Sequence, residues 1–131
     1  MNGLNLTILG AIGLAGVTAL GAGLPGKARA QAQPNGALVW AQCSACHSLA
    51  AGAPQKLGPN LNGIIGKRAG AVPKYNYSPA LKASNIVWTE AAMDQWLTRP
   101  AAMVRGSKMA FIGISDPAKR KALIQYLKRG Q

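Results

Sequence analysis

Cys43-Ser44-Ala45-Cys46-His47 brings together the only two cysteines and the only histidine of the 131-residue chain. The i, i+3 spacing places both sulfurs on one face of a helical turn, where they can form thioethers to the two vinyl groups of a haem. His47, the next residue, can then reach the iron. The motif therefore predicts one covalently bound haem c, attached through Cys43 and Cys46, with His47 as an axial ligand.

Other chemistries for this cluster fail on ligand number or on context. A structural zinc ion or an iron–sulfur cluster usually takes four protein ligands, and the chain has no further Cys or His to complete one. A thioredoxin-like CxxC motif is expected beside alternating strands and helices, a pattern this sequence lacks. A plain structural disulfide leaves the adjacent His47 without a role.

The second axial position is the next question, because a single histidine excludes bis-histidine ligation within one chain. This position is taken by another residue or by water, or it stays open, and methionine is the natural candidate. Met93 falls on a predicted helix, where core packing is its expected role. Met103 and Met109 fall in a predicted loop, and the flexible approach through 106–108 favours Met109 while leaving Met103 open. Histidine with methionine raises the reduction potential and leaves no open site for substrate chemistry.

Short helices are predicted on both sides of this motif. They cover Gly36 to Ala45 with Asn35 as cap, Thr89 to Leu97 with Thr89 as cap, and a segment that starts at Asp116 and Pro117 and ends before Gly130. Nine glycines and prolines from Ser48 to Pro79 predict a long loop, and Ala101 to Ser115 is predicted to be a second loop. The fold class is therefore all-α, in one domain.

Residues 1–30 are predicted to be a signal peptide. Leu6 to Leu24 carry no charge, and Ala28-Arg29-Ala30 gives the small-x-small pattern of a cleavage site before Gln31. The apolar run approaches the length of a membrane span, so an uncleaved anchor is the alternative, although the positive-inside rule argues against it. We expect residues 31–131 to form a monohaem domain in the periplasm, in contact with the membrane only if the leader is uncleaved.

The charge of this domain is strongly positive. From Gln31 onward there are 13 Lys or Arg against 3 Asp or Glu, a formal charge of +10. Such a field steers a protein toward acidic surfaces. Nucleic acid is disfavoured, because the basic residues are dispersed and no binding motif is present. The expected partners are redox proteins with acidic docking faces, met by a monomer.

The sequence resembles the class I cytochromes c of the mitochondrial and bacterial c2-like type, from about Gly36 to Lys128. The segments that carry the resemblance are CSACH at 43–47, LGPNLNGIIGKRAG at 57–70, YNYSPAL at 75–81, the IVW ending at Trp88, and GSKMAF at 106–111. It implies a small all-α fold in which short helices wrap around one covalent haem c and the N- and C-terminal helices pack together.

The resemblance also implies roles for single residues. The segment GSKMAF matches the one that carries the axial methionine in the family, which implies Met109 as the second iron ligand. The carbonyl of Pro59 is expected to accept a hydrogen bond from the His47 ring and so to fix its orientation. The positions that pack or hydrogen-bond around the haem propionates are held by Tyr75, Tyr77 and Trp88.

Three departures from the family pattern bear on function. Arg105 stands where the family usually has proline, and Trp96 stands where many members have a tyrosine near the methionine sulfur. Members that dock on respiratory complexes often carry lysines around the haem edge at the positions held here by Gln42, Ala101 and Ala102. Lys56 and Lys108 remain, so we expect a weaker or shifted docking face.

The function expected from these residues is that of an exported single-electron carrier with no catalytic residues. One alternative is a haem subunit that stays bound to an exported dehydrogenase as its electron exit, for which a sizeable exposed apolar patch would be the sign. Another is a peroxidatic or gas-binding haem protein, which requires Met109 to leave the iron.

Overall fold

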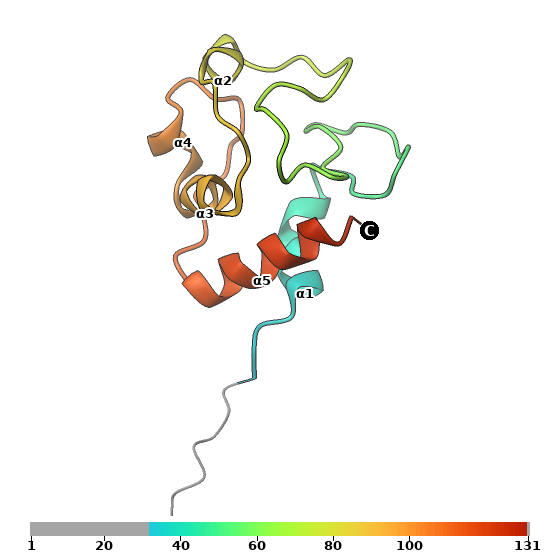
Figure 1. Cartoon of the computed structure of the whole chain (residues 1–131), viewed down its shortest axis with the longest axis vertical. Coiled ribbons are helices and arrows are strands. Elements are labelled where there is room, and N and C mark those ends of the chain that lie inside the picture. Colours follow the sequence, from blue (N-terminus) through green and yellow to red (C-terminus); the bar gives the residue numbers. More distant parts are fainter. Residues whose placement is uncertain (1–31, 131) are drawn as a thin grey trace, which may run out of the picture. The chain divides into compact units, whose positions relative to one another are not determined.

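The computed structural model describes residues 32–130, and five helices lie in this range. They are α1 (Gly36–Ser44), α2 (Pro79–Ala83), α3 (Glu90–Thr98), α4 (Pro100–Met103) and α5 (Pro117–Lys128) (Figure 1). The described residues form no strand, only an isolated antiparallel bridge between Arg68 and Val87, so the all-α prediction is confirmed. The predicted leader at 1–30 lies outside the described residues. Within residues 32–130, no helix has both the length and the apolar character needed to cross a membrane.

The three predicted helices begin where their capping residues indicated. The side chain of Asn35 accepts a hydrogen bond from the amide of Ala37 at 2.9 Å. Thr89 caps α3 and Asp116 caps α5 in the same way. Their side-chain oxygens accept hydrogen bonds from the amides of Ala92 and Ala118, at 3.1 and 2.8 Å. Each cap satisfies an amide that the first helical turn leaves without a partner.

Two short helices were not predicted, and both begin at a proline. Pro79 opens α2 behind the cap Ser78, and Pro100 both follows α3 and opens α4. Proline is compatible with the first position of a helix because the amide it lacks would have no partner there. The prediction of a loop from Ala101 to Ser115 is therefore wrong at its start, and Met103 lies in α4.

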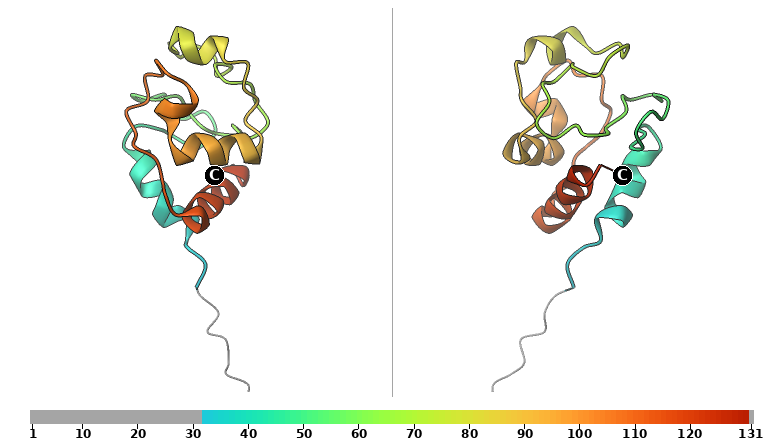
Figure 2. Two further views of the ribbon diagram at one scale, coloured as in Figure 1. Left: turned by 90° about the vertical axis from the view of Figure 1, so that its left-hand side faces the viewer. Right: turned by 45° about the vertical axis from the view of Figure 1, so that its right-hand side comes forward.

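The core forms where α5 packs against α1 and α3. Figure 2 shows α1 and α5 crossing side by side. Gly36 permits this crossing, because a Cβ there would lie 2.4 Å from the carbonyl oxygen of Ala122. Leu123, with 1% of its surface exposed, lies at the centre of the core.

The long loop between α1 and α2 is held by hydrogen bonds rather than by regular structure. The Leu61 amide donates to the Ser48 carbonyl at 2.9 Å, and the Asn60 side chain donates to two further carbonyls of the same loop. Farther along, the Gly66 amide donates to the carbonyl of Trp88 at 2.9 Å. The first bonds hold the loop's own path, and the bond to Trp88 ties the loop to the residues just before α3.

Candidate haem site

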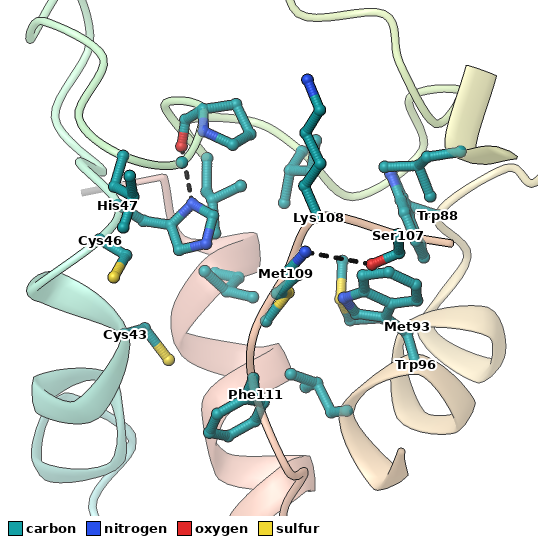
Figure 3. Close-up of a pocket in the computed structure, with 18 of the residues that line it drawn as sticks. Cys43, Cys46, His47, Trp88, Met93, Trp96, Ser107, Lys108, Met109 and Phe111 are labelled. Atoms are coloured by element: carbon teal, nitrogen blue, oxygen red, sulfur yellow. Dashed lines mark hydrogen bonds between the residues drawn. The ribbon is translucent and has the colours of Figure 1, made fainter. Parts of the chain in front are cut away.

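A largely apolar cavity of about 330 Å³ lies between the end of α1, the long loop, α3 and the segment after α4. Figure 3 shows Cys43, Cys46 and His47 on one side of it, with Met109, Trp88 and Trp96 on the other. Every site residue predicted from the sequence lines this cavity, namely Cys43, Cys46, His47, Pro59, Tyr75, Tyr77, Trp88, Trp96 and Met109. Its volume lies within the range of small-molecule and cofactor sites.

The two cysteines are held by the last turn of α1. The amides of Cys46 and His47 both donate to the carbonyl of Cys43, at 3.0 and 2.9 Å, which places the two sulfurs at the cavity within one turn. Both thiols are free and half-buried. Burial, with a smaller effect of the neighbouring Cys46, raises the pKa of Cys43 to about 11. A redox-active CxxC pair needs a lowered thiol pKa instead, so this environment does not fit thiol–disulfide exchange.

His47 is oriented by the loop that faces it. Its Nδ1 lies 2.8 Å from the carbonyl oxygen of Pro59, which can only accept, so Nδ1 carries the proton and Nε2 keeps its lone pair. Burial lowers the pKa of His47; Lys56 lowers it further, while the bond to Pro59 acts in the opposite direction. A neutral imidazole with a fixed tautomer is the form that binds a metal.

Gly58 brings the loop against the flat face of the His47 ring. A Cβ on Gly58 would lie 2.4 Å from Cε1 and 2.6 Å from Nδ1 of this ring. The amide of Gly58 donates to the carbonyl of Cys46 at 2.7 Å, which locks the close approach. Gly58 is not among the site residues predicted from the sequence, and its position beside Pro59 is the only signal for it there.

The opposite wall is formed by the segment after α4. The amide of Met109 donates to the hydroxyl of Ser107 at 3.2 Å, and the amide of Ile114 donates to the carbonyl of Leu97 at 2.7 Å. The bond to Leu97 fastens the segment to α3, the bond to Ser107 holds the turn before Met109, and Met109 lies half-buried in the cavity wall. Met103 packs partly buried against the core and does not line the cavity.

Met93, predicted to be a core residue, is buried in α3 and also lines the cavity. It lies beside Trp96, whose ring is tilted 60° to that of Trp88 at 5.3 Å between centroids (Figure 3). The two indoles build an apolar wall that excludes water from the side of Met109.

The tyrosines close another edge of the cavity. Tyr75 and Tyr77 pack edge to face with centroids 4.7 Å apart. The hydroxyl of Tyr75 donates to the carbonyl of Leu57 at 2.6 Å, whereas Tyr77 is buried and burial raises its pKa. The Tyr77 hydroxyl therefore stays protonated at neutral pH and can serve as a donor.

The donor set fits a covalently bound haem better than a bare metal ion. Among the described residues, no group of three or more His, Cys, Asp and Glu side chains comes together to hold a metal. What the cavity offers is two thiols, one imidazole nitrogen, one thioether and apolar walls. This is the set that haem attachment and axial ligation require.

Comparison with known proteins agrees with this geometry. No model of a known protein family matches the chain. The chain is 41% identical over 102 residues to cytochrome c2 of Blastochloris viridis, which covers 78% of this chain and 80% of that protein. It is 45% identical over 95 residues to cytochrome c2 of Agrobacterium tumefaciens, with coverage of 70% and 86%.

A solved structure supports the same assignment. Cytochrome cH from Methylobacterium extorquens superimposes with a TM-score of 0.68 at 42% identity, over 72% of this chain and 94% of that one. The similarities in sequence and in fold and the residues of the cofactor pocket all support the same family assignment. The chain belongs to the class I c-type cytochromes, carries one covalently attached haem c and transfers electrons.

Proposed function

We propose that the protein is an exported carrier that moves one electron at a time, with the haem attached through Cys43 and Cys46 and its iron held by His47 and Met109. The haem, when bound, supplies a ferric/ferrous couple. The observation that carries the proposal is that one apolar cavity collects the CSACH motif and Met109, from segments more than sixty residues apart, and leaves out Met103.

The chain's own part is to hold its ligands still and to exclude water. Pro59 fixes the His47 ring at 2.8 Å, and the bonds of Ser107 and Ile114 fix the segment that carries Met109. Ligands that keep one geometry in both oxidation states limit reorganisation. If His47 and Met109 both hold the iron, no position would remain for a substrate, and the role would be transfer rather than catalysis.

The destination and the partners follow from the sequence features already described. We propose that residues 1–30 direct the chain to the periplasm and are removed, leaving 31–131 as a monomer. Its formal charge of +10 favours redox partners with acidic docking faces, such as a membrane reductase, an oxidase or an exported dehydrogenase. Such docking weakens as salt rises, because exposed charges are screened.

The test is the visible spectrum of the purified holoprotein, with Met109→Ala compared against Met103→Ala. We expect Met109→Ala to lose the sulfur-to-iron charge-transfer band of the oxidised protein and to bind carbon monoxide when reduced. Met103→Ala, the matched control, should keep the band. An unchanged band in Met109→Ala would refute the ligand assignment.

The attachment is tested separately. Acid–acetone extraction should leave the haem on the wild-type chain and release it from the double variant Cys43→Ala, Cys46→Ala. A wild-type chain that loses all its haem on extraction would contradict covalent attachment through these residues.

A further inference from the structure

Arg120 of α5 is a buried charge that lies outside the haem site. Among the described residues it is the one buried side chain that carries a charge, with 9% of its surface exposed. Its guanidinium lies against Asp94 of α3, with Nε donating to Oδ1 at 2.7 Å and Nη2 donating to Oδ2 at 3.4 Å. A buried ion pair is by itself weak evidence of stability, because the desolvation of both charges offsets their attraction. What the pair connects is therefore more informative than the pair itself.

The guanidinium of Arg120 also reaches the backbone of a third segment. Its Nη1 donates to the carbonyl of Ile114 at 2.9 Å and to the carbonyl of Ser115 at 2.9 Å. Arginine can make all these bonds because its planar group carries five N–H donors in fixed directions, whereas a lysine ammonium has three donors and no fork. One side chain of α5 thus holds a carboxylate of α3 and two carbonyls of the segment that follows Met109.

These two carbonyls lie where that segment packs against the end of α3. The amide of Ile114 donates to the carbonyl of Leu97 at 2.7 Å, and the side chain of Ile114 is buried. Gly113, at φ +107°, approaches the carbonyl of Thr98 so closely that a Cβ would overlap it. We call residues 113–115 the downstream anchor.

Met109 lies between the downstream anchor and a second point of attachment after α4. There the amide of Ser107 donates to the carbonyl of Val104 at 3.2 Å. A segment held at both ends has few conformations, and release of one end lengthens the free loop and adds conformational entropy. The position of the Met109 sulfur therefore depends on both attachments.

We propose that Arg120 is a positioning residue for Met109. Its guanidinium, oriented by Asp94, holds the downstream anchor and so keeps the Met109 sulfur at the haem site. The inference rests on the proposed function, in which Met109 is an iron ligand, and adds the residue that limits how readily this ligand leaves. When the anchor loosens, conformations without Met109 at the iron become more populated, and a small ligand from solution can enter.

The test is the affinity of imidazole for the oxidised holoprotein, measured by its visible spectrum. Imidazole binds only to molecules in which the Met109 position is open, so its apparent affinity rises with the open fraction. Arg120→Lys keeps the charge and removes the fork, whereas Asp94→Asn keeps the shape and removes the carboxylate charge. We expect the affinity to rise about tenfold in Arg120→Lys and about fivefold in Asp94→Asn, because only the first removes the donors to the anchor.

Two control variants separate positioning from stability. Glu90→Gln breaks the other ion pair between the same helices, in which Glu90 of α3 is bonded to two residues of α5. Gly36→Ala loosens the crossing of α1 and α5 instead. Both should change the imidazole affinity less than twofold, although Gly36→Ala also lowers Tm. An equal rise in affinity for Gly36→Ala and Arg120→Lys at an equal loss of Tm would reduce Arg120 to a structural role and overturn the proposal.

A second measurement follows the downstream anchor itself. The amide of Ile114 is held by its bond to Leu97, so its hydrogen exchange reports opening of the anchor. The amide of Met93, which donates to the carbonyl of Thr89 at 2.8 Å, reports α3 in the same way. In Asp94→Asn, exchange should accelerate about tenfold more at Ile114 than at Met93. Equal acceleration at both amides would contradict the proposal, and this comparison holds even where the arginine variant yields too little holoprotein.

Failure of this inference is distinguishable from failure of the proposed function. If the oxidised wild-type protein lacks the sulfur-to-iron band, Met109 is not a ligand, and both the proposed ligation and the role of Arg120 are wrong. If the band is present and the Arg120 and Asp94 variants behave like Gly36→Ala, the ligation stands and Arg120 is not its positioning residue.

Discussion

Gly58→Ala tests whether the loop holds the His47 ring by direct contact. The added methyl carbon would lie 2.4, 2.6 and 2.9 Å from three atoms of the imidazole, closer than carbon atoms approach without displacement. The ring or the loop must move, and either movement disturbs the 2.8 Å bond from Nδ1 to the Pro59 carbonyl. The backbone of Gly58 is not in the left-handed region, so the effect is steric alone.

The size of the effect follows from two contributions. Overpacking of a well-packed site costs about 1–3 kcal/mol. Loss of one net hydrogen bond adds about 1 kcal/mol. Together they lower the free energy of unfolding by about 3 kcal/mol, which for a domain of this size corresponds to a fall in Tm of about 10–20 °C.

The assay is thermal unfolding of the holoprotein together with its redox-titrated visible spectrum. Gly52→Ala is the control, because Gly52 has φ +72° and no atom within 4 Å of an added Cβ. It should cost only about 1 kcal/mol of backbone strain and leave the spectrum unchanged. If Gly58→Ala had the Tm, spectrum and potential of the wild type, the close packing that we infer around the His47 ring would be refuted.

Three further substitutions test the frame around the site. Gly36→Ala should destabilise the fold by about 1–3 kcal/mol in urea unfolding, since its Cβ meets the backbone of α5 at 2.4 Å. Asp94→Ala should cost about 2 kcal/mol, since it leaves the buried Arg120 guanidinium without its carboxylate at 2.7 Å, and a cost near zero would show that the carbonyls around it suffice. The hydrogen bond from Lys128 holds the pKa of Glu90 below its ordinary 4.5. The Glu90–Lys128 pair therefore stabilises the fold above pH 4.5, and this stabilisation is lost as the pH falls through the lowered pKa of Glu90. In Glu90→Gln this part of the loss of stability in acid should be absent when urea midpoints are measured against pH.

The helices that the sequence predicted are those whose signals are local. Asn35, Thr89 and Asp116 each accept from an amide two or three residues ahead, so residues close in sequence suffice to locate α1, α3 and α5. The prolines that open α2 and α4 gave an ambiguous signal, because proline both ends helices and begins them. Only packing against the rest of the chain resolves which of the two it does.

The residues of the candidate site also fall into those with a local sequence signal and those that depend on packing. The spacing of Cys43, Cys46 and His47 is a local pattern, and the cavity collects all three. The choice between Met103 and Met109 was open on spacing alone, because it depends on α4, a helix that carries Met103 toward the core. The family resemblance supplied Met109 before the structure placed it in the cavity wall.

Contacts across long stretches of chain were beyond sequence reasoning. The approach of Gly58 to the ring of His47 depends on how the intervening loop folds back, and the position of Gly58 beside Pro59 is its only signal in the sequence. The same holds for Lys108, whose bond to the carbonyl of Asn76 joins segments 32 residues apart. Such contacts form only when the whole loop has adopted its folded conformation.

The cavity wall and the protein core are made of the same side chains. Leu97, Leu123 and Leu127 are at most 4% exposed, belong to the core between α3 and α5, and also line the haem cavity. With only 5% aromatic residues in the chain, few large side chains are available to fill the interior. A covalently held haem would then be the largest apolar element of the core, and its burial would stabilise the fold around His47 and Met109, the proposed iron ligands. Ligand geometry and folding stability are therefore coupled, because a change that loosens the haem also loosens the helices around it.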